Sequence, residues 1–101
     1  MEKEITVIEA FDLIQSGKYM ELIDLRSPEA FAGKSIKGFR NIPAPELSQK
    51  VTAIDGKKHI LLLCENGKQS HQALAILEAC EFHPQVIRGG IQDWEKIIGL
   101  D

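Results

Sequence analysis

The chain has 101 residues, of which 44% are hydrophobic and 27% charged, and its formal net charge is -3. This length and composition are typical of one folded globular domain, which we expect to cover residues 1–101. The lysines and arginines are scattered, so no basic surface for nucleic acid is expected. The sequence has neither a run of about 20 apolar residues nor a leader-like start, and we therefore expect a cytoplasmic protein without membrane contact.

The first elements in chain order are a helix and a buried strand. Apolar residues at positions 7, 10, 11 and 14 follow helical spacing and predict a helix over residues 7–16. Thr6 is placed to cap this helix, and Gly17 can supply a left-handed end. Residues 19–25 are rich in aliphatic side chains and predict a strand.

The middle of the chain carries weaker signals until residue 59. Residues 39–42 predict a short strand, and residues 45–50 predict a turn of helix. Residues 59–64, HILLLC, show too little alternation for a strand with one face in water, so we expect a buried parallel strand.

The last third predicts a helix, a strand and a second helix. The apolar spacing indicates a helix over residues 70–80, a strand at 85–87 and a helical face over 91–98. Strands that alternate with helices are typical of an α/β sheet covered by helices on both faces.

The segment CENGKQS, residues 64–70, joins the predicted buried strand to the following helix. Ligands bind at this edge of open α/β sheets. Gly67 lets the backbone turn so that several N–H groups point into one concavity, which would suit an anion. The helix start, and Lys68 if it turns inward, would favour the thiolate form of Cys64, whereas Glu65 is expected to face solvent or a partner.

This local pattern leaves other interpretations open. A cysteine at the end of a buried strand is often a small core residue without reactivity. A phosphate-binding cup, as in a cysteine phosphatase, has the same outline, but such a site needs an arginine at the end of CX5R. The sixth residue after Cys64 is Ser70.

Other chemically active side chains have structural interpretations. Cys80 shares an apolar helical stripe, so we expect it in the core and not in a bridge to Cys64. Asp24 and Arg26 follow a strand end and are expected to form a supporting ion pair. His71 is expected at the surface. The histidines lack ligand spacing to Cys, Asp or Glu, so no metal site is expected.

Four separated motifs resemble the rhodanese family. They are LIDLRSPEAF at 22–31, SIKGFRNIP at 35–43, the loop with Cys64, Gly67 and Ser70, and GGIQDW at 89–94. The resemblance implies a three-layer α/β fold with a central, mostly parallel sheet of about five strands flanked by helices. It also implies a sulfurtransferase. The loop has the sulfurtransferase length, whereas related phosphatases and arsenate reductases have a longer one.

By this resemblance Cys64 is the catalytic nucleophile, which takes sulfur from thiosulfate or a persulfide and passes it to a thiol, a protein or cyanide. No cofactor is implied. Asp24 and Arg26 would support the site. The substrate-binding residues would be Glu65, Asn66, Gly67, Lys68, Gln69 and Ser70.

Two departures from the family pattern bear on the donor. Gln69 replaces a frequent arginine and Ser35 a frequent histidine. Gln69 carries no charge, so thiosulfate binding is expected to be weaker. A sulfur carrier or interaction module with negligible thiosulfate turnover is therefore the alternative function.

Overall fold

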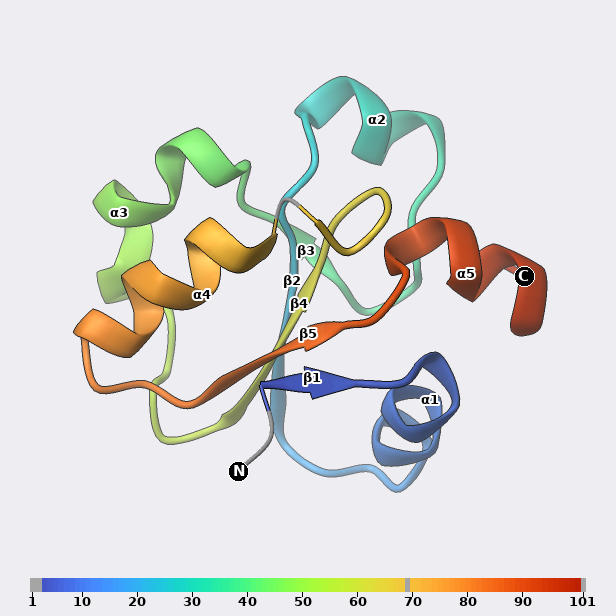
Figure 1. Ribbon diagram of the computed structural model, residues 1–101, viewed down its shortest axis with the longest axis horizontal. Coiled ribbons are helices and arrows are strands. Elements are labelled where there is room, and N and C mark those ends of the chain that lie inside the picture. The colour runs from blue at the N-terminus through green and yellow to red at the C-terminus, as the bar shows by residue number, and fades with distance from the viewer. Residues whose placement is uncertain (1–2, 69, 101) are drawn as a thin grey trace.

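The computed structural model describes residues 3–68 and 70–100 and contains a five-stranded parallel sheet (Figure 1). The strand order is β1-β5-β4-β2-β3, and each neighbouring pair is parallel. The strands are β1 (Glu4–Ile5), β2 (Met20–Asp24), β3 (Arg40–Asn41), β4 (His59–Leu63) and β5 (Pro84–Ile87). The predicted α/β class with buried parallel strands is confirmed.

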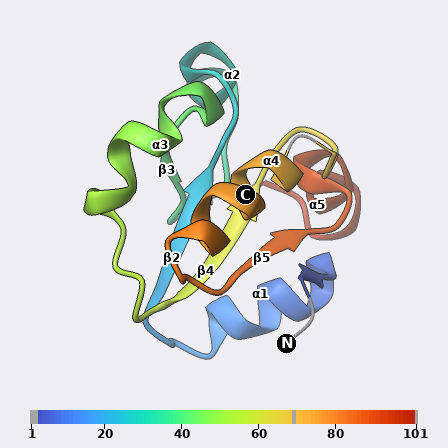
Figure 2. The ribbon, with the colours of Figure 1, turned by 60° about the vertical axis from the view of Figure 1, so that its left-hand side comes forward.

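Helices cover both faces of the sheet. They are α1 (Val7–Gln15), α2 (Pro28–Gly33), α3 (Leu47–Lys50), α4 (Ser70–Ala79) and α5 (Gly90–Ile97), with short 3-10 turns at Ala44–Glu46 and Val51–Ala53. Helices α3 and α4 lie on one face and α1 and α5 on the other, while α2 stands beyond the end of β2 (Figures 1 and 2). In the described parts of the chain, no helix is long and apolar enough to cross a membrane.

The apolar run of β4 is explained by its place in the middle of the sheet. Ile60 and Leu62 pack into the core beneath α3 and α4, whereas Leu61 and Leu63 pack into the core beneath α1 and α5. All four are fully buried, and each contributes about 1.5–3 kcal/mol by leaving water. A strand with two buried faces has no polar face, so its sequence does not alternate.

Helix α1 begins with a capping box. The Thr6 hydroxyl accepts a hydrogen bond from the Glu9 backbone N–H at 3.1 Å, and the Glu9 carboxylate accepts one from the Thr6 backbone N–H at 3.0 Å. The Glu9 carboxylate also accepts from the Thr6 hydroxyl at 3.0 Å, and the two bonds to this carboxylate, first that from the Thr6 backbone N–H, lower the pKa of Glu9. The predicted cap at Thr6 is confirmed. Gly17 follows the helix with φ of 78° and provides the expected left-handed end.

One strand and one α-helix were not predicted from the sequence. Strand β1 has only two residues, too few to show a period, and pairing with β5 creates it. Helix α2 has six residues and no buried side chain, so it lacks an apolar stripe. Its start carries a recognisable signal, because the Ser27 hydroxyl accepts from the Ala30 N–H and Pro28 occupies the first turn.

The expectation that Cys80 lies in the core is wrong. Helix α4 ends at Ala79, and its buried stripe ends at Leu77, so the chain has turned outward at Cys80, which is exposed. Cys64 is buried, and neither cysteine forms a disulfide. Trp94, by contrast, is buried and meets the rings of Phe11 and Phe39 edge to face.

Candidate active site

The loop after β4 lies at the carboxyl edge of the sheet and leads into α4 (Figure 1). Its first residue, Cys64, is 0% exposed. The Gly67 backbone N–H donates a hydrogen bond to the Cys64 sulfur over 3.0 Å. A backbone donor aimed at sulfur favours negative charge on that sulfur.

The turn of the loop depends on Gly67 and Asn66. Gly67 has φ of 88°, and a Cβ atom there would lie 2.8 Å from the Gly89 nitrogen. Glycine is therefore required for both conformation and space. The Asn66 side-chain oxygen accepts a hydrogen bond from the Lys68 backbone N–H at 3.1 Å, and this bond stabilises the turn.

The start of α5 braces the opposite side of the loop. The backbone N–H groups of Ile91 and Gln92 donate to the carbonyls of Cys64 and Glu65 at 2.9 and 3.1 Å. A Cβ atom on Gly90 would lie 2.3 Å from the Cys64 carbonyl oxygen. Because α5 holds these carbonyls, the loop keeps the conformation that turns the Gly67 N–H toward the sulfur. The sequence signal for this brace is the pair of glycines before a helical stripe.

Asp24 and Arg26 form a buried ion pair beside the loop, as the sequence predicts. The Arg26 Nε and Nη2 atoms lie 2.9–3.2 Å from the Asp24 carboxylate, and Nη2 also donates to the Lys34 carbonyl at 2.6 Å. The Asn41 side-chain amide donates to the carbonyls of Asp24 and Arg26 at 3.0 and 2.8 Å. Asn41 thus ties the segment after β2 to β3.

Glu65 extends from the loop toward Arg26. Its carboxylate lies 3.8 Å from Arg26 Nη1 and accepts from the Gln92 side-chain amide at 3.5 Å, and the side chain is 44% exposed. This agrees with the expectation that Glu65 faces solvent.

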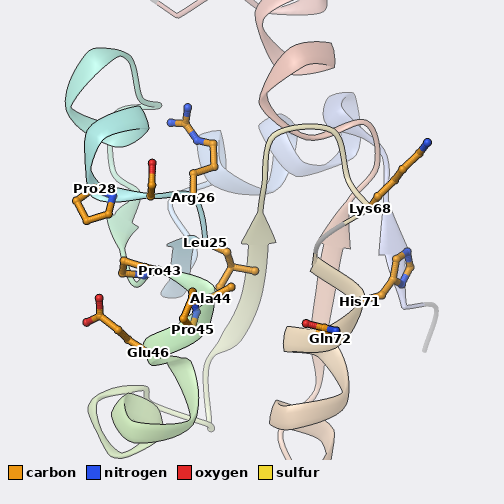
Figure 3. A pocket seen from close by; sticks show the side chains of 11 residues that line it. Leu25, Arg26, Pro28, Pro43, Ala44, Pro45, Glu46, Lys68, His71 and Gln72 are labelled. Atoms are coloured by element: carbon orange, nitrogen blue, oxygen red, sulfur yellow. The ribbon is translucent and has the colours of Figure 1, made fainter.

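The remaining loop residues differ in their surroundings. Lys68 is exposed, and Figure 3 shows its side chain extending away from Leu25 and Ala44. Ser70 is fully buried, and its hydroxyl has no hydrogen-bond partner among the described residues. His71 is exposed, as expected, with its Nε2 atom 3.8 Å from a Glu4 carboxylate oxygen. The expectation for Gln69 lies outside the described residues.

A cavity of about 690 Å³ opens beside the loop, between the segment after β2 and the start of α4 (Figure 3). Part of its wall is apolar, and Arg26, Lys68 and His71 add cationic or titratable groups. None of its apolar residues is marked as part of a site by the sequence pattern. The lining residues are Leu25, Arg26, Ser27, Pro28, Pro43, Ala44, Pro45, Glu46, Lys68, His71 and Gln72.

This arrangement combines a buried cysteine sulfur with an inward N–H group, and the cavity beside the loop is lined by Lys68 but not by Cys64. The arrangement can hold an anionic sulfur at Cys64 in surroundings that exclude water. In the described residues, no three His, Cys, Asp or Glu side chains come together in a way that would hold a metal ion.

Comparison with known families matches one model, described as "Rhodanese-like domain", over residues 6–97. That range includes the strand end with Asp24 and Arg26, the Cys64 loop and the α5 brace. Among solved structures, a rhodanese-related protein from Thermoplasma volcanium superposes with a TM-score of 0.85 at 25% identity, covering 94% of this chain and 92% of that one.

Two curated relatives are similar at about one third identity. The "Uncharacterized protein YqhL" of Bacillus subtilis strain 168 is 35% identical over 77 residues, covering 73% of this chain and 60% of YqhL. "Thiosulfate sulfurtransferase PspE" of Escherichia coli K12 is 33% identical over 73 residues, covering 70% of each chain. The chain thus spans less than two thirds of YqhL.

Proposed function

Because this chain belongs to the rhodanese-like domain family, we propose that it is a sulfurtransferase in which Cys64 carries a sulfane sulfur as a persulfide. The observation that carries the proposal is the hydrogen bond from the Gly67 backbone N–H to the Cys64 sulfur at the carboxyl edge of the sheet. An inert core cysteine needs no such donor. We also propose that residues 1–101 form one rhodanese-like domain. The single sheet, which helices cover on both faces, supports this.

The first half-reaction loads Cys64. Its thiolate attacks the outer sulfur of thiosulfate, the sulfur–sulfur bond of thiosulfate breaks, and sulfite leaves with the electron pair. A thiol persulfide can donate its outer sulfur in the same way, with the thiolate as leaving group. Thiosulfate is supported as a donor by the similarity to PspE.

The second half-reaction unloads the persulfide. An acceptor thiolate attacks the outer sulfur and becomes the persulfide, or cyanide attacks it and becomes thiocyanate, and in both cases the Cys64 thiolate is regenerated. The Gly67 N–H and neighbouring loop groups stabilise the sulfur anion in each step. Asp24 and Arg26 hold the adjacent segment in place. Because Cys64 is fully covered, a donor reaches its sulfur only when a covering group moves aside.

Mass spectrometry of the intact protein tests the proposal. After incubation with thiosulfate or a thiol persulfide, the wild type and Cys80→Ser should each gain the mass of one sulfur atom at Cys64, whereas Cys64→Ser should gain none there. Cys80→Ser is the matched control because Cys80 is exposed. A wild type that stays unlabelled with every sulfane donor contradicts the proposal.

A sulfur carrier with negligible thiosulfate turnover is the second candidate. It is favoured by the acidic side chain of Glu65, 3.8 Å from Arg26, and by the uncharged residue at position 69. Gln69→Arg separates the two functions. A large gain in thiosulfate turnover would mean that the natural protein is not built for thiosulfate, which supports the carrier. Little change supports thiosulfate as the natural donor.

A further inference from the structure

Glu65 occupies the side of Arg26 that faces the Cys64 loop. The Nε and Nη2 atoms of Arg26 are bonded to Asp24 and to the Lys34 carbonyl, and Nη1 lies 3.8 Å from Glu65. The arginine side chain is only 4% exposed. Its single positive charge is therefore opposed by two carboxylates, one fully buried and one at the loop.

The described charges next to the loop do not add up to a positive charge. Arg26 and Lys68 contribute two positive charges and Asp24 and Glu65 two negative charges, while the Glu46 carboxylate lines the same cavity and the Asp93 carboxylate lies against Gly89. Lys68 is exposed and extends outward, so water screens its charge (Figure 3). The described backbone group that meets the Cys64 sulfur is the Gly67 N–H, which attracts an anion there, whereas the negative charge of Glu65 repels it.

We propose that Glu65 is a specificity-determining residue, which disfavours dianionic sulfur donors such as thiosulfate and leaves monoanionic donors, such as the persulfide anion of a neutral thiol, as the preferred class. This inference rests on the proposed sulfur transfer at Cys64. Its physical basis is that the Coulomb energy between Glu65 and a donor is proportional to the donor charge, so a dianion is repelled about twice as strongly as a monoanion.

Two donors of matched chemistry test this dependence on charge. Thiosulfate has two negative charges and methanethiosulfonate has one, and both present a terminal sulfur bonded to a sulfonyl sulfur. In each reaction the Cys64 thiolate bonds to the terminal sulfur, and the bond to the sulfonyl sulfur breaks. Sulfite leaves from thiosulfate and methanesulfinate leaves from methanethiosulfonate, each with the bonding electron pair.

The measurement is the second-order rate constant for sulfur loading on Cys64, by rapid quench and mass spectrometry, in wild type and Glu65→Gln. Glutamine keeps the shape of the side chain and removes its charge. We expect a gain of about three- to tenfold with thiosulfate and about two- to threefold with methanethiosulfonate, since a partly exposed charge acts weakly. Glu78→Gln, at the far end of α4, should change neither rate.

The ratio of the two gains is decisive, because any effect of Glu65 on the Cys64 thiolate itself is common to both donors. Equal gains, or no gain with thiosulfate, would overturn the role of Glu65. Glu65→Ala removes the same charge without the amide and should give the same ratio, so the result does not depend on one variant. Failure of the wild type to load from either donor or from a thiol persulfide would instead refute the proposed function.

Discussion

Helices α1 and α4 begin in different ways. At the start of α1, Thr6 and Glu9 bond each other's backbone N–H groups, so the donors are used within the helix itself. Before the start of α4, the Gly67 N–H turns toward a sulfur atom, and the buried Ser70 hydroxyl has no partner among the described residues. The start of α1 is capped by side chains of the helix itself. The segment before α4 has polar groups that can hydrogen-bond a sulfur atom added to Cys64.

The two regions also differ in what holds them. The capping box of α1 is local, but the Cys64 loop depends on the ion pair after β2 and on the start of α5, both distant in sequence. Long-range support of this kind is expected where a loop must hold a fixed geometry. Substitutions that remove the support should therefore affect stability and sulfur loading together.

The largest effect is expected from Asp24→Asn. It leaves the charge of buried Arg26 poorly compensated and should lower the free energy of unfolding by about 3–5 kcal/mol. Lys50→Gln breaks the exposed Lys50–Glu46 pair and should cost at most about 0.5 kcal/mol. Urea denaturation measures both. Equal, small losses would mean that the Asp24–Arg26 pair does not brace the loop.

Gly90→Ala should cost about 2–4 kcal/mol, because its Cβ meets the Cys64 carbonyl and its φ is 61°. Displacement of the loop should also slow sulfur loading by about tenfold or more. Gly17→Ala is the matched control, since Gly17 has φ of 78° but no atom within 4 Å of an added Cβ. It should cost about 1–2 kcal/mol and leave loading unchanged. Identical behaviour of the two variants would refute the α5 brace.

Removing one hydroxyl from each helix start should separate structure from function. Thr6→Ala should lower stability by about 1 kcal/mol without changing sulfur loading. Ser70→Ala should change stability by less than about 0.5 kcal/mol, because its hydroxyl has no partner to lose, while slowing loading by about three- to tenfold. If Ser70→Ala destabilises the protein and loads normally, that hydroxyl is structural.

The smallest effect is the pH dependence of the α1 cap. The pKa of Glu9 is lowered by its bonds to Thr6 below the ordinary 4.5, so the bonds stabilise the fold above that pH. This contribution is lost as the pH falls through the lowered value. The difference in Tm between wild type and Glu9→Gln should be constant near neutral pH and shrink in acid, with sulfur loading unchanged. A difference that grows in acid would contradict this assignment.

Local patterns were sufficient to predict much of this fold. The unbroken apolar run of β4 and the helical spacing of α1, α4 and α5 reflect burial, which leaves a direct trace in sequence. Pairing creates the two-residue β1, and α2 buries no side chain, so neither element has a periodic signal. Cys80 was misplaced because the apolar stripe continues by one position past the last helical turn.

For the site, the sequence placed Cys64, its loop and the Asp24–Arg26 pair at one edge of the sheet. The direction of the Gly67 N–H, the brace at Gly90 and the ion pair between Glu65 and Arg26 depend on three-dimensional packing between distant segments. Gly67 and the pair of glycines before α5 do leave a signal in the sequence, but the segments that they contact, and the partner of Glu65, have no local pattern from which they could be predicted.

A crystal structure of the protein after exposure to a sulfane donor is the most direct test of the role of the Cys64 loop. We predict one added sulfur on Cys64, within hydrogen-bonding distance of loop backbone N–H groups and of the Ser70 hydroxyl. An unmodified Cys64 that still accepts the Gly67 N–H, with added sulfur on Cys80 alone, would contradict the account.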